Sequence, residues 1–410
     1  MRIAIVGGGA AGFFGAIAAA TCNRSAEIIL FEATHQPLDK VRISGGGRCN
    51  VTHQCFDPVE LIKNYPRGSR ELLAPFKRFQ PRDTVDWFEQ HGVRLKTEPD
   101  GRMFPITDQS STIVDCLLNV AETCGVQLRL GARIKNVESS MQNGEPRFEL
   151  TLHDNSYQSC DRVLIATGSS PQGYRFAQSL GHTIIPCVPS LFTFKISDPR
   201  LDGLAGVSFE NVSLTIIDSI GKKLRHPGPI LITHWGLSGP AVLKLSAWGA
   251  KTLNRDTYHA RLTVNFFPEQ SREQLLQKLS VYRENNGKKQ VHVDPPVALP
   301  RRYWRRIVHV SGVDVETTWT HVTRSAINAI VTELNAAQFD IVGKGIFKEE
   351  FVTCGGVSLK EIDFRTMQSR LCTGLYFAGE ILDIDGITGG FNFQSAWTTG
   401  WIAGENMAGK

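Results

Sequence analysis

Three glycines near the start of the chain, Gly7, Gly9 and Gly12, are spaced as Gly-x-Gly-x-x-Gly between an apolar run and a run of small residues. This spacing predicts a strand that turns sharply into a helix. The first glycine allows the turn, the second leaves the backbone without a side chain so that a ligand can approach it, and the third lets helix and strand pack closely. The start of such a helix offers free N–H groups and a partial positive charge. The spacing therefore predicts a cradle for the pyrophosphate of a dinucleotide.

The flanking residues supply the elements that this cradle needs. Residues 2–6 predict a strand, a helix follows to about Thr21, and a second strand, EIILFE, ends at Glu32. Glu32 lies 20 residues beyond Gly12, from where a carboxylate can accept hydrogen bonds from the adenosine ribose. Together these elements predict nucleotide binding, but they leave FAD and NAD undecided.

Two distant segments favour FAD. Residues 161–168, DRVLIATG, are typical of an apolar strand that ends in a small-residue turn. A further strand over Leu375–Ala378 leads into Gly379 and Glu380, and Gly390 opens a helix. In two-segment flavoproteins such a carboxylate reaches the ribitol chain, and the helix start faces the N1–C2=O edge, which becomes anionic on reduction. A core strand and a helix joined by a glycine-rich link is the alternative.

A third glycine cluster stands in RISGGGRCNVTH, residues 42–53. Each glycine costs about 0.5–1 kcal/mol relative to alanine in a helix or strand, so we expect irregular backbone that passes along the flavin. Bare amides would then face the ring system and the phosphates, and Arg48 and Asn50 would donate to ring oxygens or to a substrate. A surface turn with a solvated arginine is the alternative.

Hydride transfer is the work of the flavin itself, so the chain has only to position the substrate, set the charge at the ring and move a proton. Our catalytic candidates are Arg48 as an electrostatic anchor, His234 in THWGLSGP as a substrate contact or proton relay, and Cys354 in TCGGV as a proton donor. A loop histidine satisfied by backbone and a buried inert thiol are the alternatives. Tyr174, His53 and Cys49 are further candidates for proton transfer.

The 410 residues exceed a usual single domain. Short alternating runs over 190–269, with KKLRH and GPILIT as separate runs, predict antiparallel strands. Residues 270–335 change to helical spacing, and 336–348 return as a strand. We expect an FAD-binding domain of residues 1–189 and 349–410 around this insert. Because the insert has no second Gly-x-Gly-x-x-Gly, any NAD(P)H would visit the flavin transiently.

The formal net charge of +5 permits an anionic partner without requiring one. Four arginines share one helical face and could form a phosphate-binding stripe for RNA, whereas a solvated face of an amphipathic helix is the alternative. These arginines are Arg301, Arg302, Arg305 and Arg306.

The nine cysteines are scattered without metal-ligand spacing, which indicates thiols in a reducing cytosol. Residues 3–20 are uncharged and resemble a signal peptide, but a secretory core has no reason for glycines at positions 7, 8, 9, 12 and 15. No other run approaches the roughly 18 apolar residues of a membrane span. We therefore expect a cytoplasmic protein with no metal and no membrane partner. Cys49 and Cys55 leave a redox disulfide open as an alternative.

Nine stretches in chain order resemble a bacterial flavoprotein family that includes aminoacetone-oxidase-like, bile-acid-reductase-like and ribosomal-RNA dihydrouridine-synthase-like members. They are GGGAAG, KVRISGGGRCNVT, GRMFP, LIATG, LGHTI, THWGLSGPAVLKLS, FVTCGGVSLKEID, TMQSRLCTGLYFAGEILDIDG and GGFNFQSAW. The resemblance implies an α/β fold: a two-segment Rossmann-like FAD-binding domain with an inserted β-barrel-like domain, itself interrupted by a helical module. One departure is the abbreviated loop ATGSSPQGY, in which Ser169 stands where a second glycine is common.

The resemblance also implies which residues contact FAD. They are Gly7, Gly9, Ala11, Gly12, Glu32, Lys40, Ser44, Gly45, Gly46, Gly47, Arg48, Ile134, Thr167, Gly168, Glu380, Asp383, Gly390, Phe391 and Asn392, and we add Gly379 from the strand-glycine-acid pattern.

The sequence therefore predicts an FAD-dependent oxidoreductase that acts on a small molecule, either reducing an activated C=C bond or oxidising an amine. One alternative is an RNA-modifying flavoenzyme that reduces uridine in ribosomal RNA. A non-catalytic or electron-relay flavoprotein is another.

The predicted pyrophosphate cradle can be tested at Gly9, the second glycine of the motif. Gly9→Val would place a side chain where the pyrophosphate must lie, so we expect the purified variant to lose its FAD. Absorbance of the flavin relative to protein measures the occupancy. Stoichiometric FAD in this variant would contradict the assignment of the cradle.

Overall fold

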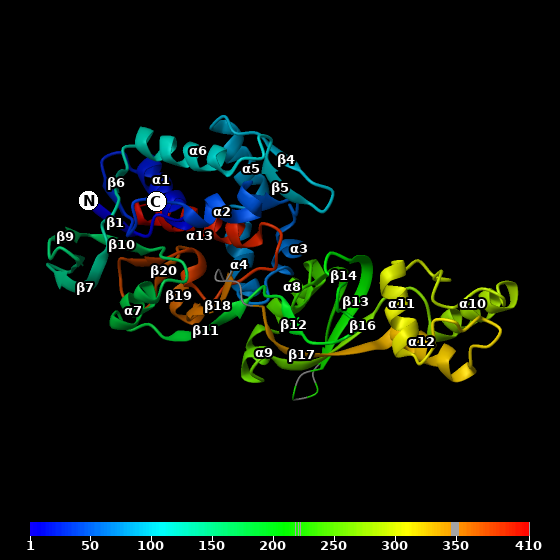
Figure 1. Ribbon diagram of the computed structural model, residues 1–410. Helices are drawn as coiled ribbons and strands as arrows, with labels where there is room; N and C mark the ends of the chain where they lie inside the picture. Colours follow the sequence, from blue (N-terminus) through cyan, green and yellow to red (C-terminus); the bar gives the residue numbers. More distant parts are fainter. Residues whose placement is uncertain (218, 220, 222, 346–351, 410) are drawn as a thin grey trace. The chain divides into compact units, whose positions relative to one another are not determined.

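The computed structural model describes residues 1–217, 219, 221, 223–345 and 352–409. The chain divides into two compact units, and each is described by itself (Figure 1). The first unit comprises Met1–Val188 and Val352–Lys410, and the second unit comprises Pro189–Phe351. The α/β class and the barrel-like insert predicted from the sequence are confirmed.

The first unit is built on a seven-stranded sheet in which two separate parts of the chain lie side by side. Its order is β19-β20-β21-β10-β1-β2-β6, with parallel pairing from β21 to β6 and an antiparallel edge at β19 and β20. The bounds are β1 Arg2–Val6, β2 Glu27–Phe31, β6 Gln127–Arg129, β10 Arg162–Ile165, β19 Ile362–Asp363, β20 Gln368–Ser369 and β21 Leu375–Phe377. The central strands are continuous apolar runs because both faces of a parallel sheet are buried.

Helix α1, Ala10–Cys22, and helix α13, Phe391–Met407, pack against each other, and their backbones approach closely at two glycines of α13 (Figure 1). A Cβ on Gly400 would lie 2.4 Å from the carbonyl oxygen of Ala11, and one on Gly404 would lie 2.3 Å from that of Gly15. Glycine is therefore required here by the close approach of the two backbones.

The remaining elements of the first unit surround this sheet. The helices are α2 Asp39–Gly47, α3 Pro58–Ile62, α4 Ser69–Phe76, α5 Pro81–Gln90, α6 Ser110–Thr123 and α7 Pro171–Ser179, with short 3-10 turns at η1 Leu359–Glu361 and η2 Gly379–Ile381. Two small sheets have the orders β3-β5-β4 and β7-β8-β9, and β11 pairs with β18. Their bounds are β3 Thr52–His53, β4 Leu95–Thr97, β5 Arg102–Pro105, β7 Ile134–Gln142, β8 Glu145–Leu152, β9 Tyr157–Cys160, β11 Ile184–Ser190 and β18 Val352–Val357.

The second unit contains a closed barrel with the order β12-β15-β14-β13-β16-β17. The bounds are β12 Phe194–Ile196, β13 Ser208–Ile217, β14 Lys223–Thr233, β15 Gly236–Ser238, β16 His259–Asn265 and β17 Ala337–Lys344. The runs KKLRH and GPILIT are not separate strands, because β14 continues through Pro227 and Gly228 opposite a register shift in β13. A bulge accommodates the proline and glycine that would otherwise end a strand.

In the described part of the second unit, five helices accompany the barrel: α8 Pro240–Trp248, α9 Ala250–Arg255, α10 Arg272–Asn285, α11 Arg301–Val310 and α12 Arg324–Ala336. Helices α10 to α12 gather at one side of the barrel and share its core (Figure 1). The rings of Phe209 and Phe266, from the barrel side, lie 5.0 Å from the ring of Tyr303 on α11. Among the described residues, no helix has both the length and the apolar character that crossing a membrane requires.

The contact between α1 and α13 predicts a stability effect. Gly400→Ala would push a methyl group against the Ala11 carbonyl, so we expect a loss of about 1–3 kcal/mol from overpacking. Urea unfolding of the FAD-free protein measures this loss. Gly9→Ala is the matched control, since its Cβ would meet no atom within 4 Å. Equal unfolding midpoints for the two variants would contradict the close approach of the helices.

Candidate functional site

The turn between β1 and α1 uses its glycines in two ways. A Cβ on Gly7 would lie 2.5 Å from the carbonyl oxygen of Ala166, and one on Gly12 would lie 1.9 Å from that of Gly7, so backbone fills both places. A Cβ on Gly9 would meet no atom within 4 Å. Gly9 is also the N-cap of α1, which has no capping side chain and no acid in its first turn. The open space at this helix start suits an anionic group.

A cavity of about 490 Å³ adjoins this turn. Four residues predicted to contact FAD line it: Gly7, Glu32, Ile134 and Thr167. The Glu32 carboxylate accepts hydrogen bonds from the backbone N–H groups of Gly8 and Thr34, both at 2.8 Å. The hydroxyl oxygen of Thr167 is buried and has no hydrogen-bond partner within the described residues. An unsatisfied buried hydroxyl and the bare Gly9 both fit a nucleotide bound at this place.

The triple glycine is irregular backbone, as predicted, although it lies within the bounds of α2. Ser44 has ψ 151°, and the φ angles of Gly45 and Gly46 are 58° and 70°. A Cβ on Gly46 or Gly47 would meet no atom within 4 Å. The loop closes at Cys49, which is buried and whose N–H donates to the Ser44 carbonyl at 3.0 Å. One side of the loop is therefore bare peptide with open space beside it.

Asn50 joins this loop to the start of α13. In the orientation that satisfies both partners, its side-chain amide accepts from the Gly390 N–H at 2.9 Å and donates to the Thr52 carbonyl at 3.1 Å. The indole N–H of Trp397 donates to the Val51 carbonyl at 2.9 Å. Helix α13 has no capping side chain and no acid in its first turn. The bare loop and an uncapped helix start are thus held together from segments more than 300 residues apart.

Glu380 links the returning segment to α2 and β18. Its carboxylate pairs with the Lys40 ammonium and accepts from the Thr353 N–H at 3.0 Å. Lys40 also reaches the hydroxyl of Ser169 at 3.4 Å, and a Cβ on Gly168 would lie 3.5 Å from the Glu380 carboxylate. The predicted residues Lys40, Gly168 and Glu380 therefore lie together, and Ser169 of the abbreviated loop contacts them.

The loop between Glu380 and α13 is fixed by its own side chains and by the segment before α4. Asn392 accepts from the Gly386 N–H at 2.8 Å and donates to the Gly386 carbonyl at 2.9 Å. A buried ion pair joins Arg67 to Asp385, whose side chain is fully buried. The buried hydroxyl of Tyr65 donates to the Phe391 carbonyl at 2.6 Å. The side chain of Asn392 thus closes the loop, and cofactor contact by this residue stays a prediction.

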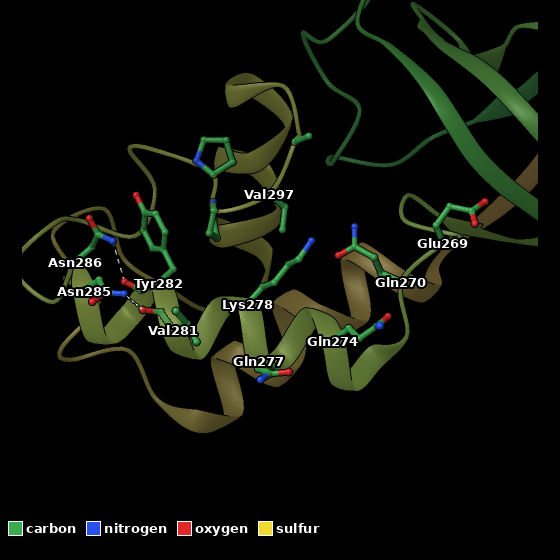
Figure 2. A pocket seen from close by; sticks show the side chains of 13 residues that line it. Glu269, Gln270, Gln274, Gln277, Lys278, Val281, Tyr282, Asn285, Asn286 and Val297 are labelled. Atoms are coloured by element: carbon green, nitrogen blue, oxygen red, sulfur yellow. Dashed lines mark hydrogen bonds between the residues drawn. The ribbon is translucent and has the colours of Figure 1, made fainter.

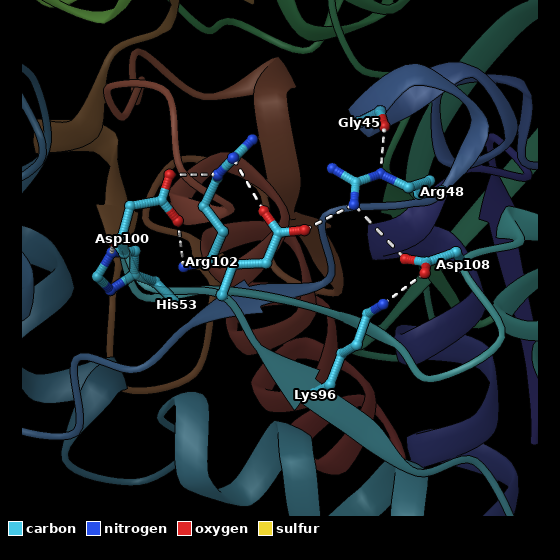
Figure 3. A network of polar contacts seen from close by, with 8 residues as sticks. Gly45, Arg48, His53, Lys96, Asp100, Arg102 and Asp108 are labelled. Carbon is cyan, nitrogen blue, oxygen red and sulfur yellow. Dashed lines mark hydrogen bonds and ion pairs between the residues drawn. The ribbon is translucent and has the colours of Figure 1, made fainter. Parts of the chain in front are cut away.

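Arg48 lies in a network of charges beside the triple glycine (Figure 3). Its Nη1 donates to Glu98 at 2.6 Å and to Asp108 at 3.5 Å, and its guanidinium lies 4.0 Å from the ring centroid of Phe104. The hydrogen bond to Glu98 raises the pKa of Arg48, and the Lys96 ammonium lowers the pKa of Asp108. The bonds to the two acids use Nη1, which leaves Nη2 to face another partner.

Sequence reasoning missed the acids that hold Arg48. Lys96, Glu98, Asp100 and Arg102 stand at every second position from β4 through the turn into β5, and Glu98 is the one of them that contacts Arg48. Glu98 also accepts from Arg102 at 3.0 Å, and Arg102 donates to Asp100 at 2.7 Å, whereas Lys96 joins the network through Asp108 (Figure 3). In the sequence, the alternating charged residues at positions 96–102 were the one feature that could have pointed to Glu98 as a partner of a basic residue.

The other proton-transfer candidates fall in different places. Cys354 is fully buried in β18. His234 is exposed in the second unit, between β14 and β15. Tyr174 has a buried hydroxyl, and burial together with the nearby Cys187, Glu380 and Asp383 raises its pKa, so the phenol stays protonated at neutral pH. Catalytic roles for these residues stay predictions.

The four arginines of the predicted RNA stripe lie on α11 but differ in their contacts. Arg302 and Arg306 donate to the carbonyls of Gly203 and Asp202, and Arg301 pairs with Asp294 at 2.8 Å. Arg305 is exposed and has no ion pair with the described residues. Packing within the second unit therefore uses part of this face, and RNA binding stays a prediction.

Comparisons with known proteins agree with this geometry. The chain is 30% identical over 413 residues to ribosomal RNA dihydrouridine synthase of Escherichia coli strain K12, covering 98% of this chain and 97% of the relative. It is 27% identical to 3-dehydro-bile acid delta(4,6)-reductase of Clostridium scindens, covering 99% of both. A 3-ketosteroid-delta4-(5alpha)-dehydrogenase from Rhodococcus jostii RHA1 superposes with a TM-score of 0.52 at 14% identity, over 100% of this chain and 96% of the other. At that identity, the superposition shows the fold alone.

These findings first define the class: the chain is a flavoprotein oxidoreductase with a Rossmann-type domain. The family follows from the HI0933-like protein Rossmann domain, which matches residues 1–406. The chain belongs to this HI0933-like family, as its motifs indicate.

The burial of Cys49 predicts an unreactive thiol. Burial raises its pKa to about 12, so almost no thiolate forms at neutral pH and alkylation should be slow. Iodoacetamide labelling followed by mass spectrometry should modify the exposed Cys22 first and Cys49 only after unfolding. Cys49 labelling in the native protein as fast as Cys22 labelling would instead indicate a reactive, redox-competent thiol.

Proposed function

We propose that this enzyme reduces a C=C bond conjugated to a carbonyl group. The observation that carries the proposal is the similarity along almost the whole chain to two kinds of enzyme whose names describe the same chemistry. One makes dihydrouridine from uridine, and the other is a delta(4,6)-reductase of a 3-dehydro-bile acid. Both saturate a double bond in conjugation with a carbonyl.

The first unit supplies the parts that such a reaction needs. We assign the pyrophosphate to the bare turn at Gly9, the ribose to Glu32 and the ribitol chain to Glu380 with its partner Lys40. When bound, FAD supplies the hydride, through N5 of its ring. The uncapped start of α13 at Gly390 would stabilise negative charge on the reduced ring. NADPH or NADH would act as a transient electron donor.

The substrate carbonyl needs a fixed positive group, because hydride addition places negative charge on its oxygen. Arg48 fits this task, since Glu98 and Asp108 fix its orientation beside the open loop through Nη1 while Nη2 faces away from them. The reaction then needs a proton at the carbon next to the carbonyl. Tyr174 and Cys354 are the candidate donors within the first unit, and the raised pKa of Tyr174 keeps its proton available.

A second candidate is reduction of uridine within ribosomal RNA, which is the same chemistry on a macromolecule. Residues 270–335 carry ten lysines and arginines against six acids, a formal +4 of the chain total of +5. Positive charge gathered in one segment is what binding to RNA phosphates requires. The Escherichia coli relative of similar length is named for this reaction on ribosomal RNA.

Anaerobic stopped-flow spectroscopy tests the reaction class. We expect NADPH or NADH to bleach the flavin, and 2-cyclohexenone to restore its colour faster than buffer alone. Arg48→Met should keep FAD but slow the second step by about tenfold or more, the loss of one charge-stabilising donor. Arg82→Met is the matched control, since Arg82 likewise lies over a phenyl ring, that of Phe56. Bleaching by amines with rapid re-oxidation in air would instead identify an amine oxidase.

A further inference from the structure

A groove of about 750 Å³ lies in the helical part of the second unit (Figure 2). One wall is a single face of α10, and the other is the segment Pro295–Ala298. The α10 residues in the wall are Gln274, Gln277, Lys278, Val281, Tyr282 and Asn285, spaced by three, one, three, one and three positions as one helical face requires. The volume lies within the range of about 300–1,000 Å³ that is usual for small-molecule sites.

The groove combines free amide groups with flat apolar surfaces. Gln277 has no hydrogen-bond partner for its side chain within the described residues, and the Oε1 atom of Gln270 is buried without one. Asn285 and Asn286 donate through Nδ2 to carbonyls of α10, which leaves each Oδ1 as an acceptor. Tyr282, Pro295 and Pro296 add flat apolar surface. Amides that can pair in the plane of a ring, next to surfaces on which a ring can stack, suit an unpaired nucleobase.

The net positive charge of residues 270–335, in which the groove lies, favours a polyanion over a peptide of mixed charge. Lys278 lines the groove and is exposed (Figure 2). Elsewhere in the helical part of the second unit, outside the lining, Lys288, Lys289 and Arg305 are exposed as well, and none of the four forms an ion pair with a described residue. Such free cations can neutralise phosphates without breaking an existing pair. Glu269 is the one acid among the described lining residues.

We propose that this groove binds a single-stranded RNA segment, with unpaired bases against α10 and Pro295–Ala298 and with Lys278 on a phosphate. The proposal rests on the second candidate function, because it names where the RNA of that reaction docks. A double helix does not fit, since the amides lie inside a groove and the base edges of A-form RNA are not splayed out. The site is distinct from the nucleotide-binding residues of the first unit.

Fluorescence anisotropy with a labelled oligouridylate of about ten nucleotides tests the groove in the FAD-bound protein. Lys278→Gln removes one phosphate contact, so the slope of log affinity against log salt should fall by about 0.7. Gln277→Leu should weaken binding while leaving that slope unchanged, because it removes an amide and no charge. Lys223→Gln, an exposed lysine of β14 in the same unit, is the matched control and should change neither quantity.

The outcomes separate this inference from the function on which it rests. If the wild-type protein binds the oligouridylate and neither groove variant weakens this binding, the groove is not the RNA site, but the RNA reaction remains a candidate function. Equal affinity for a duplex of the same length would also overturn it. If the wild-type protein does not bind the oligouridylate at low salt, both the groove as an RNA site and the RNA reaction are rejected. The proposed reduction of a conjugated C=C bond, tested by re-oxidation of the flavin with 2-cyclohexenone, is unaffected by that result. Unchanged circular dichroism of each variant excludes loss of folding as the cause.

Discussion

The first unit depends on the direct contact of two backbones, that of α1 and that of α13. Gly400 and Gly404 bring α13 against the carbonyls of Ala11 and Gly15, where no side chain fits. This contact fixes the start of α13 relative to the start of α1, the two helix ends that can face an anionic cofactor. Every later feature of the site, from Glu380 to Gly390, is placed by the segment that this packing holds.

Around that contact, hydrogen bonds and a buried ion pair hold neighbouring loops in place. Asn50 ties the triple glycine to Gly390, and Arg67 holds the preceding loop through the buried Asp385. Removing one partner of a buried ion pair is costly, by about 3–5 kcal/mol, so these loops have little freedom to move apart. The open peptide at Gly46 and Gly47 is therefore a preformed surface, which lowers the ordering cost of binding a flat ring.

Much of this arrangement could be predicted from local sequence. The Gly7, Gly9 and Gly12 spacing and the acid at Glu32 specify a βαβ unit, since each has a backbone or hydrogen-bonding reason to be there. The helical period of residues 301–308 likewise places Tyr303 and Trp304 inside and the arginines outside, as the structure has them. Such predictions succeed because the signal and its structural cause lie within a few residues of each other.

Other features depend on partners far away in the chain. Strand β14 passes through Pro227 and Gly228 because its neighbour shifts register there, which no local pattern reveals. The acids that hold Arg48 come from the turn between β4 and β5 and from the loop after β5, 50 and 60 positions further on. The alternation of charges at 96–102 could have marked that face, but only the pairing of β3, β4 and β5 brings it to Arg48.

The interrupted sheet also bears on the order of events during synthesis. Strand β21 and helix α13 are translated about two hundred residues after β10, with the whole second unit between them. The second unit is continuous, so it can complete its core while the sheet still exposes the edge of β10 to the surrounding medium. A nascent chain must therefore keep that apolar edge from pairing with other chains until its last helix emerges from the ribosome.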